Sequence, residues 1–76
     1  MERELIEYIA KNLVNDPDAV SVTHRRAGST TILELKVASG DMGRVIGKQG
    51  RVANAMRSLL RVIGDREGTR INLDID

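Results

Sequence analysis

Cysteine, tryptophan and phenylalanine are absent from this sequence of 76 residues, and histidine occurs once. The absence of cysteine excludes a disulfide framework, a thiolate nucleophile and a cysteine-based zinc site. The single histidine, His24, cannot form a histidine-based metal cluster and leaves catalysis without an obvious general base. We therefore expect a non-enzymatic protein with no catalytic residues, no metal site and no cofactor.

A long apolar run is also missing. No stretch approaches the roughly 20 apolar residues that span a bilayer, and the first four residues, Met-Glu-Arg-Glu, are too acidic for a signal peptide. We expect a soluble, cytoplasmic protein without a membrane partner. A chain of this length makes one domain, 1–76. So small a domain buries only about 60% of its unfolded surface, which leaves little room for an enclosed small-molecule site.

Charge is balanced overall but uneven along the chain. The formal net charge is +1, and residues 1–40 hold six acidic and five basic side chains. Residues 44–61 hold five basic side chains and no acidic one. A polyanion partner needs such a one-sign segment, although a solvated helix face is the simpler interpretation from charge alone. The five basic residues are Arg44, Lys48, Arg51, Arg57 and Arg61.

Hydrophobic periodicity predicts the elements of the first half. Residues 5–13 carry apolar side chains at helical spacing, and Asn-Asp-Pro at 15–17 ends this helix. Residues 20–24 and 31–37 alternate with period two, which is typical of half-buried strands. We expect Ala-Gly-Ser at 27–29 to connect the two strands as a hairpin.

The second half is predicted to hold two helices and a strand. A short helix over about 41–46, capped by Asp41 or Ser39, leads to a loop at 47–50, and a longer helix follows it. One half of the longer helix is apolar and the other is basic and polar. Residues 71–75 alternate again and form a third strand. The apolar half comprises Val52, Ala53, Ala55, Met56, Leu59, Leu60, Val62 and Ile63.

The order of the predicted elements defines the fold class. Three strands that each have one apolar face need a cover, which three amphipathic helices supply. We therefore predict an α+β fold in the order α-β-β-α-α-β, with a three-stranded sheet covered on one face by three helices.

The segment most informative about function is Gly-Arg-Val-Ile-Gly-Lys-Gln-Gly-Arg at 43–51. Gly47 and Gly50 allow a sharp turn between two helices, and their lack of Cβ lets a phosphate–sugar chain lie against the main chain. The helix that follows points its unpaired N–H groups and its positive dipole end at that chain. Lys48 and Arg51 add full positive charge. The segment therefore predicts a clamp for a nucleic-acid backbone.

The same residues carry a family resemblance. The Val-Ile-Gly-Lys-Gln-Gly-Arg stretch resembles the GXXG signature of KH domains, which clamp about four nucleotides of single-stranded backbone. The order of elements is similar to the type II KH arrangement. Over essentially all 76 residues, the chain resembles the small stand-alone bacterial KH proteins of the KhpA type. That likeness includes Leu-Ile-Glu-Tyr-Ile at 5–9, Asn-Asp-Pro-Asp at 15–18 and the extended motif at 43–53.

The resemblance implies which residues contact RNA. Phosphates are expected near the loop, bases are expected over an aliphatic floor beside it, and Asn54 is expected to hydrogen-bond sugar or base. One departure is Ala53, where many KH domains carry a large aliphatic residue, so the groove floor is expected to be shallower, with Met56 as a partial substitute. The expected RNA-binding residues are Arg44, Val45, Ile46, Gly47, Lys48, Gln49, Gly50, Arg51 and Asn54.

Other polar residues stay open at this point. Arg57 and Arg61 lie further from the loop, and a solvated face is the simpler interpretation of Arg61. His24 is expected to be an ordinary edge-strand residue, and Tyr8 lies outside the apolar stripe of the first helix. The family's final strand and the loop before it lie alongside the groove. Residues that stay open as its borders are Arg66, Arg70 and Asn72.

The resemblance implies a non-enzymatic protein that binds single-stranded RNA as an RNA chaperone or post-transcriptional regulator. It also implies a homodimer or a pair with a larger KhpB-like KH protein, and a second groove would raise the modest affinity of one groove through avidity. The alternative is a protein-interaction adaptor that has the KH fold and binds little RNA. Without strand aromatics the chain does not fit an RRM, and without a G-x-x-x-x-G-K-[ST] motif it does not fit a nucleotide hydrolase.

Overall fold

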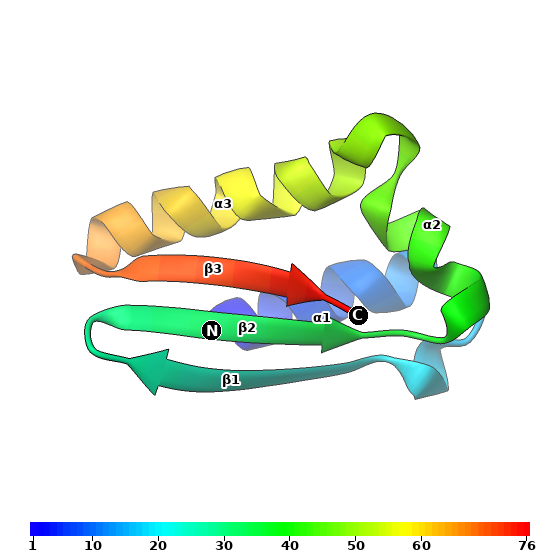
Figure 1. The fold of residues 1–76 in the computed structure, drawn as a ribbon, viewed down its shortest axis with the longest axis horizontal. Coiled ribbons are helices and arrows are strands. Elements are labelled where there is room, and N and C mark those ends of the chain that lie inside the picture. The colour runs from blue at the N-terminus through cyan, green and yellow to red at the C-terminus, as the bar shows by residue number, and fades with distance from the viewer.

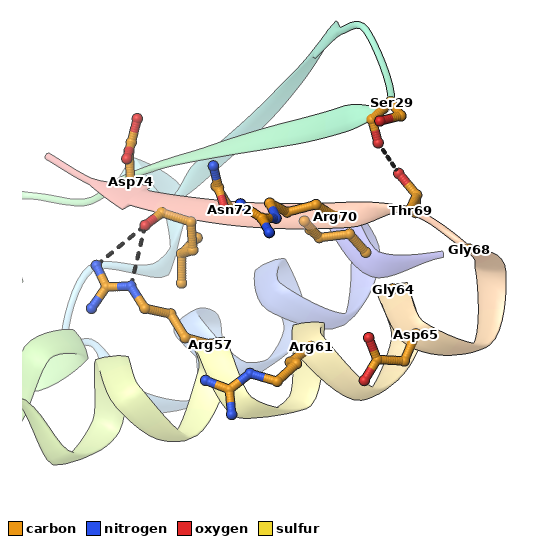
Figure 2. Close-up of a pocket in the computed structure, with 12 residues that line it drawn as sticks. Ser29, Arg57, Arg61, Gly64, Asp65, Gly68, Thr69, Arg70, Asn72 and Asp74 are labelled. Carbon is orange, nitrogen blue, oxygen red and sulfur yellow. Dashed lines mark hydrogen bonds between the residues drawn. The ribbon is translucent and has the colours of Figure 1, made fainter.

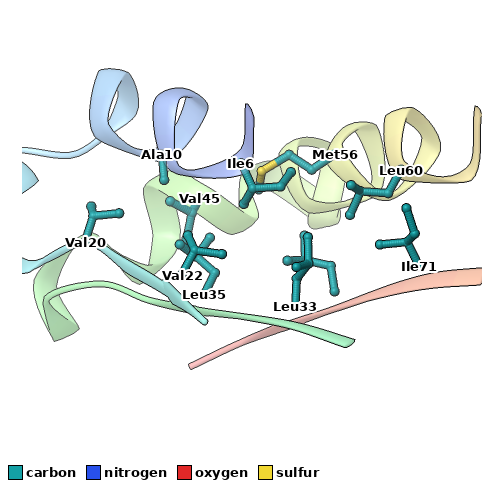
Figure 3. Packing of buried hydrophobic residues seen from close by; sticks show 11 residues of the cluster. Ile6, Ala10, Val20, Val22, Leu33, Leu35, Val45, Met56, Leu60 and Ile71 are labelled. Atoms are coloured by element: carbon teal, nitrogen blue, oxygen red, sulfur yellow. The ribbon is translucent and has the colours of Figure 1, made fainter. Parts of the chain in front are cut away.

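The computed structural model describes residues 1–76 and contains three longer helical segments and three strands (Figure 1). The predicted order is confirmed. Figure 3 shows α1 and α3 on one side of the buried side chains and the strands on the other. The bounds are α1 (Glu2–Leu13), β1 (Ser21–Ala27), β2 (Thr30–Lys36), α2 (Met42–Ile46), α3 (Arg51–Glu67) and β3 (Arg70–Ile75).

The sheet is mixed, with strand order β1-β2-β3. The hairpin makes β1 antiparallel to β2, with Val22 opposite Leu35, and its turn has Gly28 at a φ of 64°. Parallel strands need a crossover connection, and α2 and α3 supply it between β2 and β3, which pair in parallel. As a result β3 is an edge strand, and α3 packs along it.

Alternating side chains of the strands build the core. In β2 every second side chain is buried, and in β3 Ile71 and Leu73 are buried and Ile75 is half-buried, while the intervening side chains of both strands are exposed or half-buried. In β1 only Val22 is buried, and His24 is exposed as expected of an edge-strand residue. The helices contribute Ile6 and Ala10 from α1 and Met56 and Leu60 from α3. The cluster comprises Ile6, Ala10, Val20, Val22, Leu33, Leu35, Val45, Met56, Leu60, Ile71 and Leu73 (Figure 3).

The predicted apolar half of α3 is only partly buried. Ala53, Met56 and Leu60 face the core, whereas the side chains of Leu59 and Val62 are 46% and 54% exposed. The prediction that these two and Ala55 pack on the core is therefore wrong. A helix that rests on one layer buries a stripe of its surface, and no other element of this chain covers the flank that carries Leu59 and Val62.

The predicted helix cap before α2 is also wrong. Neither Asp41 nor Ser39 caps that helix with a side-chain hydrogen bond. Instead, the buried carboxylate of Asp41 accepts hydrogen bonds from the backbone N–H groups of Asn15 and Asp16, both at 3.1 Å. The carboxylate thus ties the end of α1 to the start of α2. None of the helices is long and apolar enough to cross a membrane.

Candidate nucleic-acid interface

The glycine loop between α2 and α3 has an unusual backbone. Gly47, Gln49 and Gly50 have φ angles of 78°, 57° and 77°. Gln49 is the one residue other than glycine with positive φ, and such residues gather at functional sites because their conformational strain must be held by the surroundings. The Gly47 N–H closes α2 on the Gly43 carbonyl at 2.9 Å, and the Gly50 N–H bonds the Gly47 carbonyl at 3.1 Å. The chain therefore reverses within four residues.

This reversal brings the predicted polar residues together at the start of α3. Lys48, Gln49 and Arg51 are exposed around the loop. The exposed Asn54 has its amide nitrogen 3.6 Å from the position that a Cβ on Gly50 would take. The Arg51 N–H bonds the Lys48 carbonyl, and no side chain caps the start of α3, so the positive end of the helix dipole is open to an anion here. The loop therefore offers backbone donors, two cations and two amides on one surface.

The residues that precede the loop have different roles. Val45 is fully buried in the core. It therefore has no surface for the RNA contact that the sequence predicted, and it anchors α2 instead. Ile46 is 36% exposed beside the loop and can contact a ligand. Arg44 is half-exposed and its Nε lies 3.4 Å from the Asp41 carboxylate. Ala53 and Met56, expected under the groove floor, are both buried.

A hollow of about 950 Å³ extends along α3 and β3 toward the hairpin. Arg57 and Arg61 enter it from α3, and Arg70 and Asn72 border it from β3 (Figure 2). At its far end, the Thr69 hydroxyl donates a hydrogen bond to the Ser29 carbonyl and joins the α3–β3 loop to the hairpin. Polar groups therefore continue the surface that begins at the glycine loop.

The basic side chains of the chain beyond Arg44 have no carboxylate within ion-pairing distance. Ion pairs occupy Arg3, Lys11 and Arg44. The basic residues that follow in sequence make no ion pair within 4 Å, so no direct contact neutralises their charge, although the carboxylates of Asp65 and Asp74 also line the hollow. They are Lys48, Arg51, Arg57, Arg61, Arg66 and Arg70.

The hollow was only partly foreseeable from sequence. Arg57 and Arg61 stand one helical turn apart, which places them on one flank of α3, but the sequence does not tell which neighbour that flank faces. The structure brings Arg70 and Asn72 to the hollow and leaves Arg66 outside its lining. No sequence pattern predicted a role for Ser29, because its place in the hollow depends on the hydrogen bond between the hairpin tip and Thr69.

The order of elements, the mixed sheet and the glycine loop between α2 and α3 define a KH domain of the type II arrangement. The model of the family described as "KhpA/KhpB, KH domain" matches residues 3–75, and the chain belongs to this family.

Curated relatives match along almost their whole length. The RNA-binding protein KhpA of Caldanaerobacter subterraneus subsp. tengcongensis is 49% identical, with 95% of this chain and 96% of the relative covered. The protein of the same name from Treponema pallidum is also 49% identical, with 99% and 94% covered. That of Clostridium acetobutylicum is 47% identical, with 96% and 97% covered.

Solved structures share the fold at low identity. Aquifex aeolicus Era bound to GDP and aluminium fluoride matches with a TM-score of 0.63 and 15% identity over 97% of this chain and 29% of that one. Era in complex with MgGDPNP and a segment of 16S ribosomal RNA matches equally well, over 28% of its chain. The likeness therefore covers one part of a larger protein.

Proposed function

We propose that this protein binds single-stranded RNA without catalysing a reaction, and that the Gly47–Gly50 loop clamps the RNA backbone. The observation that carries the proposal is the exposed loop with three positive φ angles, placed at the uncapped start of α3 beside the unpaired Lys48 and Arg51. Phosphates would lie on the backbone N–H groups and the two cations, as anions do at helix N-termini. The RNA-binding name of the relatives supports the same ligand.

Beyond the loop, the RNA would pass between α3 and β3. Asn54 would contact sugar or base, and Ile46 would support a base from the other side of the loop. Because the proposed loop contacts are with the RNA backbone, we expect these contacts to give little preference for base sequence. Such binding suits a cytoplasmic RNA chaperone or post-transcriptional regulator that handles many transcripts.

The test is fluorescence anisotropy of labelled single-stranded RNA with wild type and with the Lys48→Asp, Gln49→Asp double variant. We expect the double variant to lose binding, because negative charge replaces the clamp. Lys36→Asp is the control for acidic substitution away from the loop, with a charge change of two units against three in the double variant, since Lys36 is also exposed and makes no ion pair but lies at the end of β2. Equal loss in the loop variant and in the Lys36 control would contradict the clamp and leave only general charge attraction.

We propose in addition that the protein works as a dimer, with a second copy or with a larger KhpB-like KH protein. Support comes from the uncovered apolar side chains on the helices: Tyr8 of α1 is 68% exposed, and Leu59 and Val62 of α3 are 46% and 54% exposed. Exposed apolar side chains that lie close together mark interaction sites, and Leu59 and Val62 are neighbours on one helix, three residues apart. The same exposed residues also favour the second candidate function, a protein-interaction adaptor. The adaptor would be supported if the loop variant retained partner binding and cellular function.

A further inference from the structure

One hydrogen-bonded bridge crosses the hollow between α3 and β3. The Arg57 guanidinium donates from Nε and Nη2 to the Leu73 carbonyl oxygen, at 3.4 and 3.2 Å (Figure 2). The arginine thus reaches from the helix to the open edge of the sheet. Arg57 makes no ion pair. Its charged guanidinium is therefore bonded to a neutral backbone carbonyl within the surface proposed above to bind RNA.

The Leu73 carbonyl is the acceptor that the edge of β3 would otherwise offer to a ligand. The N–H groups of Arg70 and Asp76 bond to β2, at the carbonyls of Ser29 and Leu35. Because backbone groups alternate sides along a strand, those of Leu73 point away from β2 toward the hollow. A free strand edge presents one N–H donor and one C=O acceptor, which together match a base edge that carries an acceptor beside an amino group.

Arg57 changes what this edge can recognise. Two of its five N–H groups are used on the carbonyl, and three remain to face the hollow. With the carbonyl occupied, the backbone edge at Leu73 presents donors only, although the side chains of the adjacent Asn72 and Asp74, which line the hollow as well, carry acceptor oxygens. Donors at this edge suit the O4 of uracil or the O6 and N7 of guanine, whereas the amino groups of cytosine and adenine find no backbone acceptor there.

We propose that Arg57 is a specificity-determining residue of the RNA groove, which selects an oxo-bearing base beside Leu73 and disfavours an amino-bearing one. The proposal rests on the proposed RNA-binding function and adds base preference to it. Uracil and cytosine give the sharpest comparison, because the two pyrimidines have the same size and differ only at positions 3 and 4, where uracil has an N3–H donor and an O4 acceptor and cytosine has an N3 acceptor and an amino group.

The experiment measures the affinity of the full chain for the single-stranded octamers U8 and C8 by fluorescence anisotropy at one salt concentration. Wild type is expected to prefer U8 by about tenfold, which lies within the range that one arginine–base contact supplies. In Arg57→Met the carbonyl is free to accept from an amino group, and the U8-to-C8 ratio is expected to fall to about one or below. Arg61→Met is the matched control, because Arg61 also lines the hollow but has no bond to Leu73. It should weaken both octamers and preserve the ratio.

The outcomes separate this proposal from the RNA clamp. If the loop double variant loses binding while Arg57→Met keeps the wild-type ratio, the clamp stands and the selecting role of Arg57 is overturned. Equal affinity of wild type for both octamers overturns it as well. If Arg57→Met loses the ratio while the loop variant still binds, the selecting role stands and the clamp fails. Absence of binding by wild type overturns both. Should Arg57→Met fail to fold, Arg57→Gln makes the same comparison, because the shorter amide cannot place two donors on the carbonyl.

Discussion

At Gly47, both the backbone and the packing require that no side chain be present. Its φ of 78° and ψ of 170° lie in a region essentially reserved for glycine. A Cβ there would sit 2.6 Å from Val52 Cγ2 and 2.8 Å from the Val52 backbone nitrogen. We expect Gly47→Ala to lower the free energy of unfolding by about 2 kcal/mol and to weaken RNA binding, because the start of α3 must move. Chemical denaturation and anisotropy measure the two effects.

Gly43→Ala is the control for this substitution. Gly43 lies in α2 without positive φ, and a Cβ there would meet no atom within 4 Å. Alanine favours a helix by about 0.8–1 kcal/mol over glycine, so the control is expected to be neutral or slightly stabilising. A Gly47→Ala protein as stable as this control would mean that the loop adapts and that its geometry is not needed.

Individual phosphate contacts should appear in the salt dependence of binding. Lys48 and Arg51 are exposed without ion pairs, and each contact with single-stranded RNA contributes roughly 0.7 to the slope of log K against log salt. We expect Lys48→Met and Arg51→Met each to reduce the slope by that amount, and Lys36→Met to leave it unchanged. An unaltered slope for Lys48→Met would show that its ammonium does not touch phosphate.

At the scale of single residues, the sequence predicted the turn at the loop glycines and placed Lys48, Arg51 and Asn54 beside them, because the positions of glycines and of charged and polar residues can be read directly from the sequence. It did not separate the buried Val45 from the half-exposed Ile46. A helix of five residues is too short for its periodicity to tell which of two adjacent aliphatic side chains faces the core.

Among the connections between elements, the Asp41 carboxylate ties the start of α2, the helix that leads to the glycine loop, to the end of α1. It accepts the N–H groups of Asn15 and Asp16 and lies beside Arg44. Asp41→Ala leaves two backbone donors without their partner in a part-buried site, so we expect a loss of about 3 kcal/mol in the free energy of unfolding. Urea denaturation measures it, with the exposed Asp18→Ala as a control expected within about 0.5 kcal/mol of wild type. A small effect of Asp41→Ala would show that water replaces the carboxylate.

Periodicity was sufficient to predict the elements and their order, because each strand and long helix repeats its pattern over several residues. It was insufficient for Asp41, whose partners are 25 and 26 residues away in sequence. Local rules assign an aspartate before a helix to capping, and only the three-dimensional arrangement shows that its carboxylate turns toward α1. The exposed flank of α3 was missed for a related reason, since amphipathicity does not tell how much of an apolar half has a neighbour.

Over the whole molecule, both open edges of the sheet carry an arginine from a neighbouring helix. Arg3 of α1 donates to the Val22 carbonyl of β1 at 3.3 Å, and Arg57 of α3 donates to the Leu73 carbonyl of β3. Edge strands with free backbone groups invite pairing with other chains, and these contacts occupy part of each edge. Strand pairing at these two positions is therefore disfavoured, which favours the apolar flank of α3 as the surface for the partner proposed above.

The proposed dimer is tested by a charge on that flank. We expect wild type to sediment as a dimer at micromolar concentration and Leu59→Glu to sediment as a monomer, because a carboxylate cannot be buried there without a partner. Ser21→Glu is the control, since Ser21 is exposed on the sheet opposite Lys36 and tolerates the charge.

Avidity adds at least about tenfold when two grooves engage one RNA. Leu59→Glu should therefore weaken binding to a long RNA and leave binding to an octamer unchanged. Equal loss on both RNAs would place Leu59 in the RNA groove, and a monomeric wild type would assign the flank to a different protein partner.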